Sequence, residues 1–322
     1  MKLNHWLNIV CLTILLGLPL LIGNEINAQA LVPGTGTQVP EVGDDFEDPT
    51  WEYQLSLPKV FNHGETTVAN NLPGGAAING RWYEGSKRGQ PDTMRRVVTP
   101  VGGLSGSTTA LALRSLQTGS NRPTFQQQQD DLIASVSNRV GKISVAQSPS
   151  VVTRVWFPPV DQWERRSGCH FAFRMAIETE SGPIQSASYR GRNVTTIGES
   201  WPGFFVNLES KQSDGATTAA TAPRAYLWMK ADQRGQQING PEITQTGWWT
   251  FGISLSPDGQ VHYFAKPGIE DLTAADHIAS SYPHGQRTVN LRNFFFNVCN
   301  GDDGQTWSSE FVIDDPSLYV IR

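Results

Sequence analysis

The stretch TGWWTFGISLSPDGQVHYFAKPG, residues 246–268, decides the fold expected for this chain. From Trp249 to Leu255 an apolar side chain occupies every second position, and the alternation resumes at Val261 after Ser-Pro-Asp-Gly. Side chains along a β-strand point alternately to its two faces, so this period marks two strands. Alternation on both sides of a turn that carries Asp-Gly predicts an antiparallel β-hairpin.

The same period of two recurs along most of the chain. We expect further strands at residues 111–116, 151–157, 170–178, 203–209, 224–230, 291–298 and 310–320. Gly, Pro, Asn and Asp separate these runs, and that spacing predicts a β-sandwich or barrel rather than an α/β fold. Residues 129–141 differ, because their apolar residues have helical spacing between a candidate N-cap, Asp131, and a stop, Gly141. This segment predicts a short surface helix.

The beginning of the chain has the layout of an export signal. Lys2 precedes an apolar run at residues 7–22, and the small residues at 28–30 suit a cleavage site. We therefore expect a signal peptide at residues 1–30, a flexible Gly/Pro-rich leader at 31–42 and a single β-domain at 43–322. The alternative is an uncleaved anchor helix, and no later stretch is apolar for long enough to span a membrane. Export predicts a secreted protein, either extracellular or periplasmic.

Charge and cysteine content limit the possible partners. Removal of residues 1–30 takes away Lys2 and Glu25, so the formal net charge stays at −5. An acidic domain has no general attraction for nucleic acid. Cys169 and Cys299 remain, and an exported pair permits a disulfide. Two buried free thiols are the alternative.

Three stretches together resemble secreted jelly-roll domains of the concanavalin A-like lectin/glucanase superfamily. They are DDFEDPTW at residues 44–51, GWWTFGISLSPDGQVHY at 247–263 and FVIDDPSLY at 311–319. The resemblance implies an all-β fold, an antiparallel β-sandwich of the concanavalin A-like jelly-roll type, with the short helix on its surface. Domains of this kind bind glycans or cut them, and the fold alone does not choose between the two.

In such jelly rolls the first and last strands commonly pair, which would bring the two acidic ends together. Asp44 or Asp45 would then approach Asp314 or Asp315, and their carboxylates would repel one another. A Ca²⁺ ion, which binds oxygen ligands, would relieve the repulsion and join the ends. Structural Ca²⁺ is the one cofactor predicted. The alternative is that the four acids end strands in solvent.

Glycan binding needs flat aromatic surfaces and polar groups that fix the orientation of the sugar. Four tryptophans lie among polar, Gly or Pro residues: Trp82, Trp163, Trp201 and Trp307. Positive charge concentrates beside the first of them, at Arg81, Lys87, Arg88, Arg95 and Arg96. With Trp82 and Tyr83, these cations would hold an anionic polysaccharide through Arg–carboxylate or Arg–sulfate pairs. The alternatives are aromatic rings that seal loops onto the sheet and a solvated basic loop.

Two enzymatic schemes have candidate residues. Glu178 and Glu180 lie two apart on one strand face, which suits the ~5–5.5 Å carboxyl separation of a retaining glycosidase. The glucanases of the resembled superfamily carry a central Asp in this motif, whereas Thr179 stands here. His262 and Tyr263 are similar to the catalytic types of polysaccharide lyases, although neighbours in a strand face opposite ways.

The function that we expect is non-catalytic binding of an extracellular glycan, neutral or anionic. A polysaccharide lyase, and after it a glycoside hydrolase, is the alternative, and a structural cell-surface domain without a ligand is the third. An enzyme predicts a deep cleft with converging polar groups, and a binding module predicts a groove with exposed Trp. A structural domain predicts neither feature.

Overall fold

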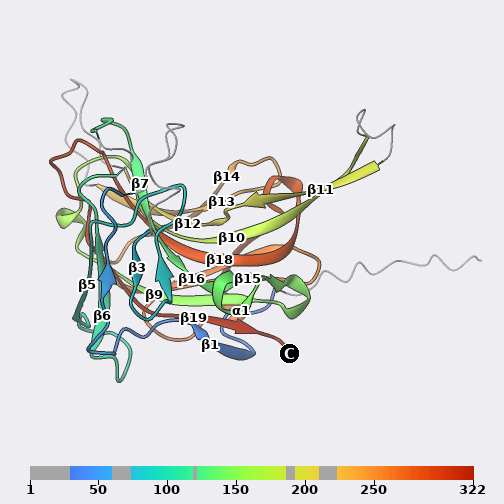
Figure 1. Ribbon diagram of the computed structural model, residues 1–322, viewed down its shortest axis with the longest axis horizontal. Coiled ribbons are helices and arrows are strands. Elements are labelled where there is room, and N and C mark those ends of the chain that lie inside the picture. Colours follow the sequence, from blue (N-terminus) through green and yellow to red (C-terminus); the bar gives the residue numbers. More distant parts are fainter. Residues whose placement is uncertain (1–29, 60–73, 119–121, 186–192, 210–222) are drawn as a thin grey trace, which may run out of the picture.

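Two antiparallel β-sheets stacked face to face form the protein (Figure 1). The computed structural model describes residues 30–59, 74–118, 122–185, 193–209 and 223–322. One short α-helix accompanies the sheets within these residues. The predicted fold class, an all-β antiparallel sandwich, is therefore confirmed.

One sheet has eight strands. In spatial order they are β17 (His277–Ser281), β16 (Val261–Pro267), β15 (Gly247–Leu255), β9 (Ser150–Phe157), β19 (Phe311–Val320), β6 (Thr109–Arg114) and β5 (Thr93–Val98), with β1 (Thr37–Gly43) paired to β19. The hairpin predicted at residues 246–268 is β15–β16, which pairs from Leu255 opposite Val261 to Trp249 opposite Pro267.

The other sheet has eleven strands. In spatial order they are β14 (Gln237–Ile243), β13 (Arg224–Lys230), β12 (Gly203–Glu209), β10 (Gly168–Gln185), β18 (Arg287–Asn300), β7 (Gln128–Ala134), β4 (Trp82–Tyr83), β3 (Ala76–Ala77) and β2 (Tyr53–Gln54). β11 (Asn193–Ser200) pairs with β10, and β8 (Ile143–Ser144) pairs with β18. Short 3₁₀ turns occur at Val145–Gln147, Val160–Gln162, Ala274–Asp276 and Pro283–Gly285.

The core lies between the two sheets and is rich in aromatic rings. On β10, Phe171 and Phe173 are buried in it, while Arg174 between Phe173 and Met175 takes the opposite face. Phe173 stacks on Phe296 of β18 with ring centroids 5.5 Å apart. Alternation along these central strands therefore assigns one face to the core and leaves the other face to solvent.

The first and last strands pair, as the resemblance implied (Figure 1). Gly43 lies opposite Ser317, with a φ of 85°, and a Cβ at this position would lie 1.9 Å from the carbonyl oxygen of Pro316. Only glycine permits this close approach. The amide of Asp44 then donates to the Pro316 carbonyl at 3.2 Å.

The leader predicted to be flexible at residues 31–42 is instead held against the eight-stranded sheet. Its second half belongs to β1, and Val32 packs against a cluster that contains Phe264. The hydroxyl of Ser254 donates to the carbonyl of Leu31 at 2.6 Å. Pairing with β19 supplies the hydrogen bonds that an isolated Gly/Pro-rich segment lacks.

The helix predicted at residues 129–141 is only half present. Gln128–Ala134 forms strand β7, and the helix α1 is limited to Val136–Val140, with Ser135 rather than Asp131 before it. Gly141 ends the helix with a φ of 80°, as expected. Pairing with β18 outweighs the helical spacing of the apolar residues.

Across the described residues, each helix is too short or too polar to span a membrane.

Phe46 gives a test of this architecture. Phe46 is fully buried, although it lies in the acidic sequence DDFED at residues 44–48. Its ring centroid is 5.6 Å from that of Trp51 and 6.0 Å from that of Trp82. Phe46→Ala should lower the free energy of unfolding by about 3–5 kcal/mol, because it leaves a cavity in the core. Val101→Ala is the control, since Val101 is 98% exposed. Urea unfolding measures both, and equal stability of the two variants would contradict the placement of Phe46.

Candidate functional site

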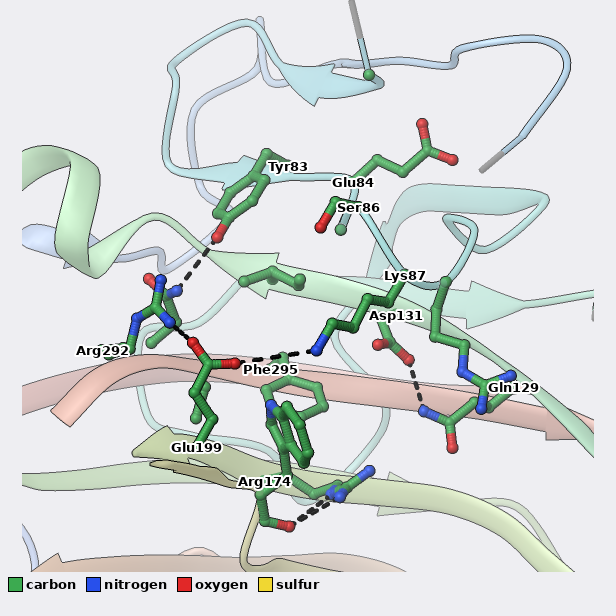
Figure 2. A pocket seen from close by; sticks show the side chains of 17 residues that line it. Tyr83, Glu84, Ser86, Lys87, Gln129, Asp131, Arg174, Glu199, Arg292 and Phe295 are labelled. Atoms are coloured by element: carbon green, nitrogen blue, oxygen red, sulfur yellow. Dashed lines mark hydrogen bonds and ion pairs between the residues drawn. The ribbon is translucent and has the colours of Figure 1, made fainter. Parts of the chain in front are cut away.

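The outward face of the eleven-stranded sheet holds a cavity of about 770 Å³ (Figure 2). Strands β7, β10 and β18 form its floor, and the segments after β4 and around the end of β11 form its sides. Its lining includes Tyr83, Glu84, Lys87, Arg88, Gln129, Asp131, Arg174, Glu199, Trp201, Arg292, Asn293 and Phe295. We call this the first cavity.

Arg174 projects from β10 into the first cavity. Its guanidinium donates from Nε and Nη2 to the carbonyl of Trp201, at 3.0 and 2.8 Å. The same group lies 5.0 Å from the ring centroid of Phe205 and 5.2 Å from that of Phe295. Burial lowers the pKa of Arg174, which means that its charge is poorly solvated. A bound anion would offset that loss of solvation.

Three charged side chains meet at the rim (Figure 2). Glu199 forms ion pairs with Arg292 and, at 3.9 Å, with Lys87. The ammonium of Lys87 also lies 4.7 Å from the ring centroid of Trp201, which is 37% exposed. The rim therefore combines an exposed aromatic face with two cations that share one carboxylate.

The first cavity is lined by two titratable groups with raised pKa values, Asp131 and Tyr83. Asp131 accepts hydrogen bonds from Gln129 Nε2 at 2.9 Å and from Asn297 Nδ2 at 2.5 Å. Burial raises the pKa of Asp131. Asn293 donates to the hydroxyl of Tyr83 at 3.2 Å, and burial raises the pKa of Tyr83 against the opposing charge of Arg292. Both shifts favour the protonated forms of these two groups.

A second cavity of about 250 Å³ adjoins the first and shares Gln129 and Arg174 with it. Its other lining residues are Gln127, Cys169, Phe205, Asn207, Trp228, Lys230, Gln237 and Cys299. Among these described residues the charged side chains are both cationic, Arg174 and Lys230, and the rest are amides, aromatic rings and thiols. We call the two adjoining cavities together the groove, and Arg174 lines both of them.

The predicted aromatic binding residues divide between groove and core. Trp201 and Tyr83 line the first cavity. Trp82 is fully buried against Phe46 and Phe296, so it belongs to the core rather than to a binding surface.

The other two predicted tryptophans are also engaged within the protein. Trp163 is 3% exposed, and its indole donates to the carbonyl of Pro158 at 2.8 Å. Trp307 is half-buried, with the guanidinium of Arg114 located 5.2 Å from its ring centroid. The buried indole of Trp163 therefore seals a loop onto the sheet.

The basic cluster also divides. Lys87 and Arg88 line the first cavity. Arg81 donates to the carbonyls of Pro40 and Gly43 and so holds β1 in place. Arg95 pairs with Glu310 at 2.9 Å, and Arg96 donates to the carbonyl of Phe46. The last three arginines support loops, because carbonyls and a carboxylate already occupy their guanidinium groups.

The four predicted catalytic candidates lie apart from the groove. His262 and Tyr263 are 1% and 0% exposed. His262 lies between Ser256 and Ser280, and Tyr263 donates to the carbonyl of Lys230 at 2.6 Å. Burial lowers the pKa of His262 to about 4. These contacts give both residues a role within the folded protein.

Glu178 and Glu180 follow Arg174 along β10, but the described lining of the two cavities includes neither of them. Glu178 accepts hydrogen bonds from Lys142 at 2.5 Å and from Asn290 at 2.9 Å. The bond from Lys142 lowers the pKa of Glu178. A carboxyl group that stays ionised is unsuited to protonate a leaving group.

Known proteins that resemble this chain in structure share little sequence with it. No protein-family model matches the sequence, and no curated protein matches it either. Similar solved structures include a carbohydrate esterase from the Shiga toxin-encoding bacteriophage phi24B, with a TM-score of 0.42 and 11% identity over 76% of this chain and 91% of that one. An alginate lyase from Pseudomonas aeruginosa has a TM-score of 0.37 and 8% identity over 72% of this chain and 87% of that one.

An endo-β-1,4-glucuronan lyase from the fungus Trichoderma reesei has a TM-score of 0.34 and 10% identity, over 84% of this chain and 94% of that one. Identities and scores of this size do not decide an activity. The two stacked antiparallel sheets with paired first and last strands are the arrangement that the resemblance to jelly-roll domains implied.

Two of the predicted calcium ligands, Asp44 and Asp45, directly follow β1, and the other two, Asp314 and Asp315, belong to β19. Asp44 accepts hydrogen bonds from Trp51 Nε1 at 3.1 Å and from Asn79 Nδ2 at 2.8 Å, and Asp45 accepts one from the amide of Glu47. Within the described part of the chain, no three His, Cys, Asp or Glu side chains are grouped as a metal site. Structural calcium stays a prediction.

The buried acid of this region is Asp314. It is 1% exposed, its Oδ2 accepts a hydrogen bond from Ser107 at 2.8 Å, and its Oδ1 is buried without a hydrogen-bond partner. Burial, reinforced by the charges of Asp315 and Glu47, raises the pKa of Asp314 to about 7. A cation bound at this point would favour the ionised form and lower that pKa.

Asp314 makes stability depend on pH. Because its pKa is higher in the folded state than in the unfolded chain, its contribution to stability is complete below about pH 4 and is lost as the pH rises through about 7. Asp314→Asn does not ionise. At about pH 8 the variant should exceed the wild type in free energy of unfolding by about 1–3 kcal/mol, because only the wild type then buries a poorly solvated negative charge. The difference should shrink by about pH 5, and urea unfolding at both pH values measures it.

Calcium would change that result in a specific way. If the ion binds the acids of this region, added Ca²⁺ should raise the melting temperature of the wild type at about pH 8, and a chelator should lower it again. Asp314→Asn should respond less, since it lacks the charge. A wild-type melting temperature that neither addition changes would dismiss a structural calcium.

Proposed function

We propose that the groove binds an anionic polysaccharide outside the cell and that Arg174 receives an acidic group of the chain. The observation that carries this proposal is the position of Arg174, a poorly solvated cation at the junction of the two cavities. Guanidinium pairs with carboxylate or sulfate through parallel hydrogen bonds. The external location rests on the predicted signal peptide.

The groove also offers the other groups that sugar recognition needs. Trp201 in the first cavity and Trp228 in the second present indole rings against which a sugar face can stack. The amides of Gln129, Asn207 and Gln237 can donate to and accept from hydroxyl groups. A few polar groups among aromatic surfaces are typical of ligand sites.

The second cavity favours an acidic sugar over a neutral one. Its two described charges, Arg174 and Lys230, are both positive, and Lys230 lies 5.5 Å from the ring centroid of Phe205. In the first cavity, Glu199 already neutralises part of the positive charge of Lys87 and Arg292. A ligand carboxylate at the rim must therefore compete with Glu199, whereas in the second cavity it meets cations only.

Isothermal titration calorimetry tests the proposal by measuring the affinity for an oligo-uronate and for a neutral cello-oligosaccharide. The oligo-uronate should bind, and more weakly at high salt, because salt screens exposed charges. Lys230→Gln and Lys87→Gln should each weaken binding roughly tenfold, the loss expected for about 1.4 kcal/mol from a charged hydrogen bond. Lys230→Gln should weaken binding more than Lys87→Gln does, because Lys87 is already paired with Glu199.

Arg95→Gln is the matched control. It removes the same charge from an arginine that pairs with Glu310, away from the groove, so affinity should not change. Equal binding of the neutral and acidic oligosaccharides, or an equal loss in the control variant, would contradict the proposal.

Cleavage of the bound polysaccharide is the second candidate function. The observation that favours it is the presence of two titratable groups, Asp131 and Tyr83, in the lining of the first cavity, because elimination needs one group to take the proton beside the uronate carboxylate and one to protonate the leaving oxygen. Elimination from a uronate polymer produces an unsaturated sugar that absorbs ultraviolet light. If the groove cleaves, Tyr83→Phe should abolish the absorbance rise and keep most of the binding. If the wild type binds the polymer without any absorbance rise, the result contradicts cleavage and supports binding as the function of the groove.

A further inference from the structure

Cys169 and Cys299 lie side by side on the floor of the second cavity. They belong to the hydrogen-bonded neighbours β10 and β18, and their sulfur atoms are 3.7 Å apart as free thiols. They pack with Ala172 and Phe205 in a small cluster separate from the core between the sheets. Both therefore face the groove, although they are only 6% and 3% exposed.

The surroundings of the two sulfur atoms differ. Arg166 donates to the carbonyl of Cys169 at 2.5 Å, and Arg174 lines the same cavity as both thiols. Positive charge favours a thiolate. The thiol of Cys299 donates to the sulfur of Cys169, and that hydrogen bond, with the two arginines, lowers the pKa of Cys169. The same hydrogen bond, together with burial, raises the pKa of Cys299.

We propose that this pair is a reversible thiol–disulfide exchange site that opens onto the groove and reacts with small disulfides. Cys169 is the attacking residue, and Cys299 is the resolving one. The proposal goes beyond a static structural disulfide, because it gives the two thiols different roles and a route for a reagent. It does not depend on glycan binding.

The chemistry balances with one molecule of a small disulfide. The Cys169 thiolate attacks one sulfur of the reagent, which forms a mixed disulfide and expels one small thiolate. The Cys299 sulfur, after losing its proton to that thiolate or to water, attacks Cys169 and expels the second small thiolate. The protein loses two electrons and two protons, and the reagent is reduced to two thiols.

Oxidation would link β10 covalently to β18, the strands that carry Arg174 and Phe295. The bond would close a loop from residue 169 to residue 299, and closing a long loop restricts the unfolded chain more than the folded one. The oxidised protein should therefore melt at a higher temperature than the reduced protein. A double variant, Cys169→Ser with Cys299→Ser, should show no such difference after the same treatment.

The test uses hydroxyethyl disulfide on the native, pre-reduced protein, followed by intact mass and peptide mapping that separates Cys11 from the other two cysteines. The wild type should lose two hydrogen atoms at Cys169 and Cys299 and release two molecules of mercaptoethanol. Cys299→Ser should stop at a mixed disulfide on Cys169. Cys169→Ser should react more slowly than Cys299→Ser, because burial still raises the pKa of the thiol that remains.

Two results would overturn the proposal. The first is that both thiols stay unmodified in the native protein while the same sample reacts after unfolding in guanidinium, which would make them inert packing groups. The second is that the early mixed disulfide of the wild type maps to Cys299. This mapping needs only the wild-type protein, so it remains decisive if a serine variant does not fold.

Discussion

The structure depends on the alternation of side chains along β10 from Phe171 to Ala176, where its pairing with β18 is regular. Phe171, Phe173 and Met175 fill the space between the sheets, and this fixes Arg174 on the outward face, opposite Phe295. A slip of one residue would place a guanidinium in the aromatic core and expose phenylalanine rings to water, so the register is strongly specified. Core and groove are thus two faces of the same strands, and the packing that stabilises one positions the other.

Much of the fold follows from the sequence because alternation is a local signal. The strands expected at residues 203–209 and 224–230 are β12 and β13, and the hairpin at 246–268 is β15–β16. The prediction was wrong where distant pairing decides the conformation. Residues 129–134 have helical spacing, yet β18 offers them a ladder of hydrogen bonds, and the leader gains its order from β19 in the same way.

The groove was harder to predict than the fold, because its residues come from strands far apart in the chain. Trp201 and Tyr83 were identified from their polar surroundings, and they line the cavity. Arg174 was missed, although a lone cation between Phe173 and Met175 marks the outward face of a buried strand. Asp131 was assigned to a helix cap, and that error hid its position on the floor. Trp82 has polar neighbours in the sequence, yet it is fully buried. The exposure of an aromatic ring depends on tertiary packing, which cannot be read from the adjacent residues.

The distribution of charge makes the proposed anion site compatible with a net charge of −5. Asp314 and its acidic neighbours lie on the eight-stranded sheet, whereas Arg174 and Lys230 lie in the groove of the other sheet. A partly buried cation acts through a medium of low dielectric constant, so at contact distance it outweighs remote carboxylates that water and salt screen. Net charge therefore argues against general attraction to polyanions but not against a local anion site. Arg174, together with Arg166, also acts on the sulfur of Cys169, so the proposed anion site and the proposed thiol site share one of their cations.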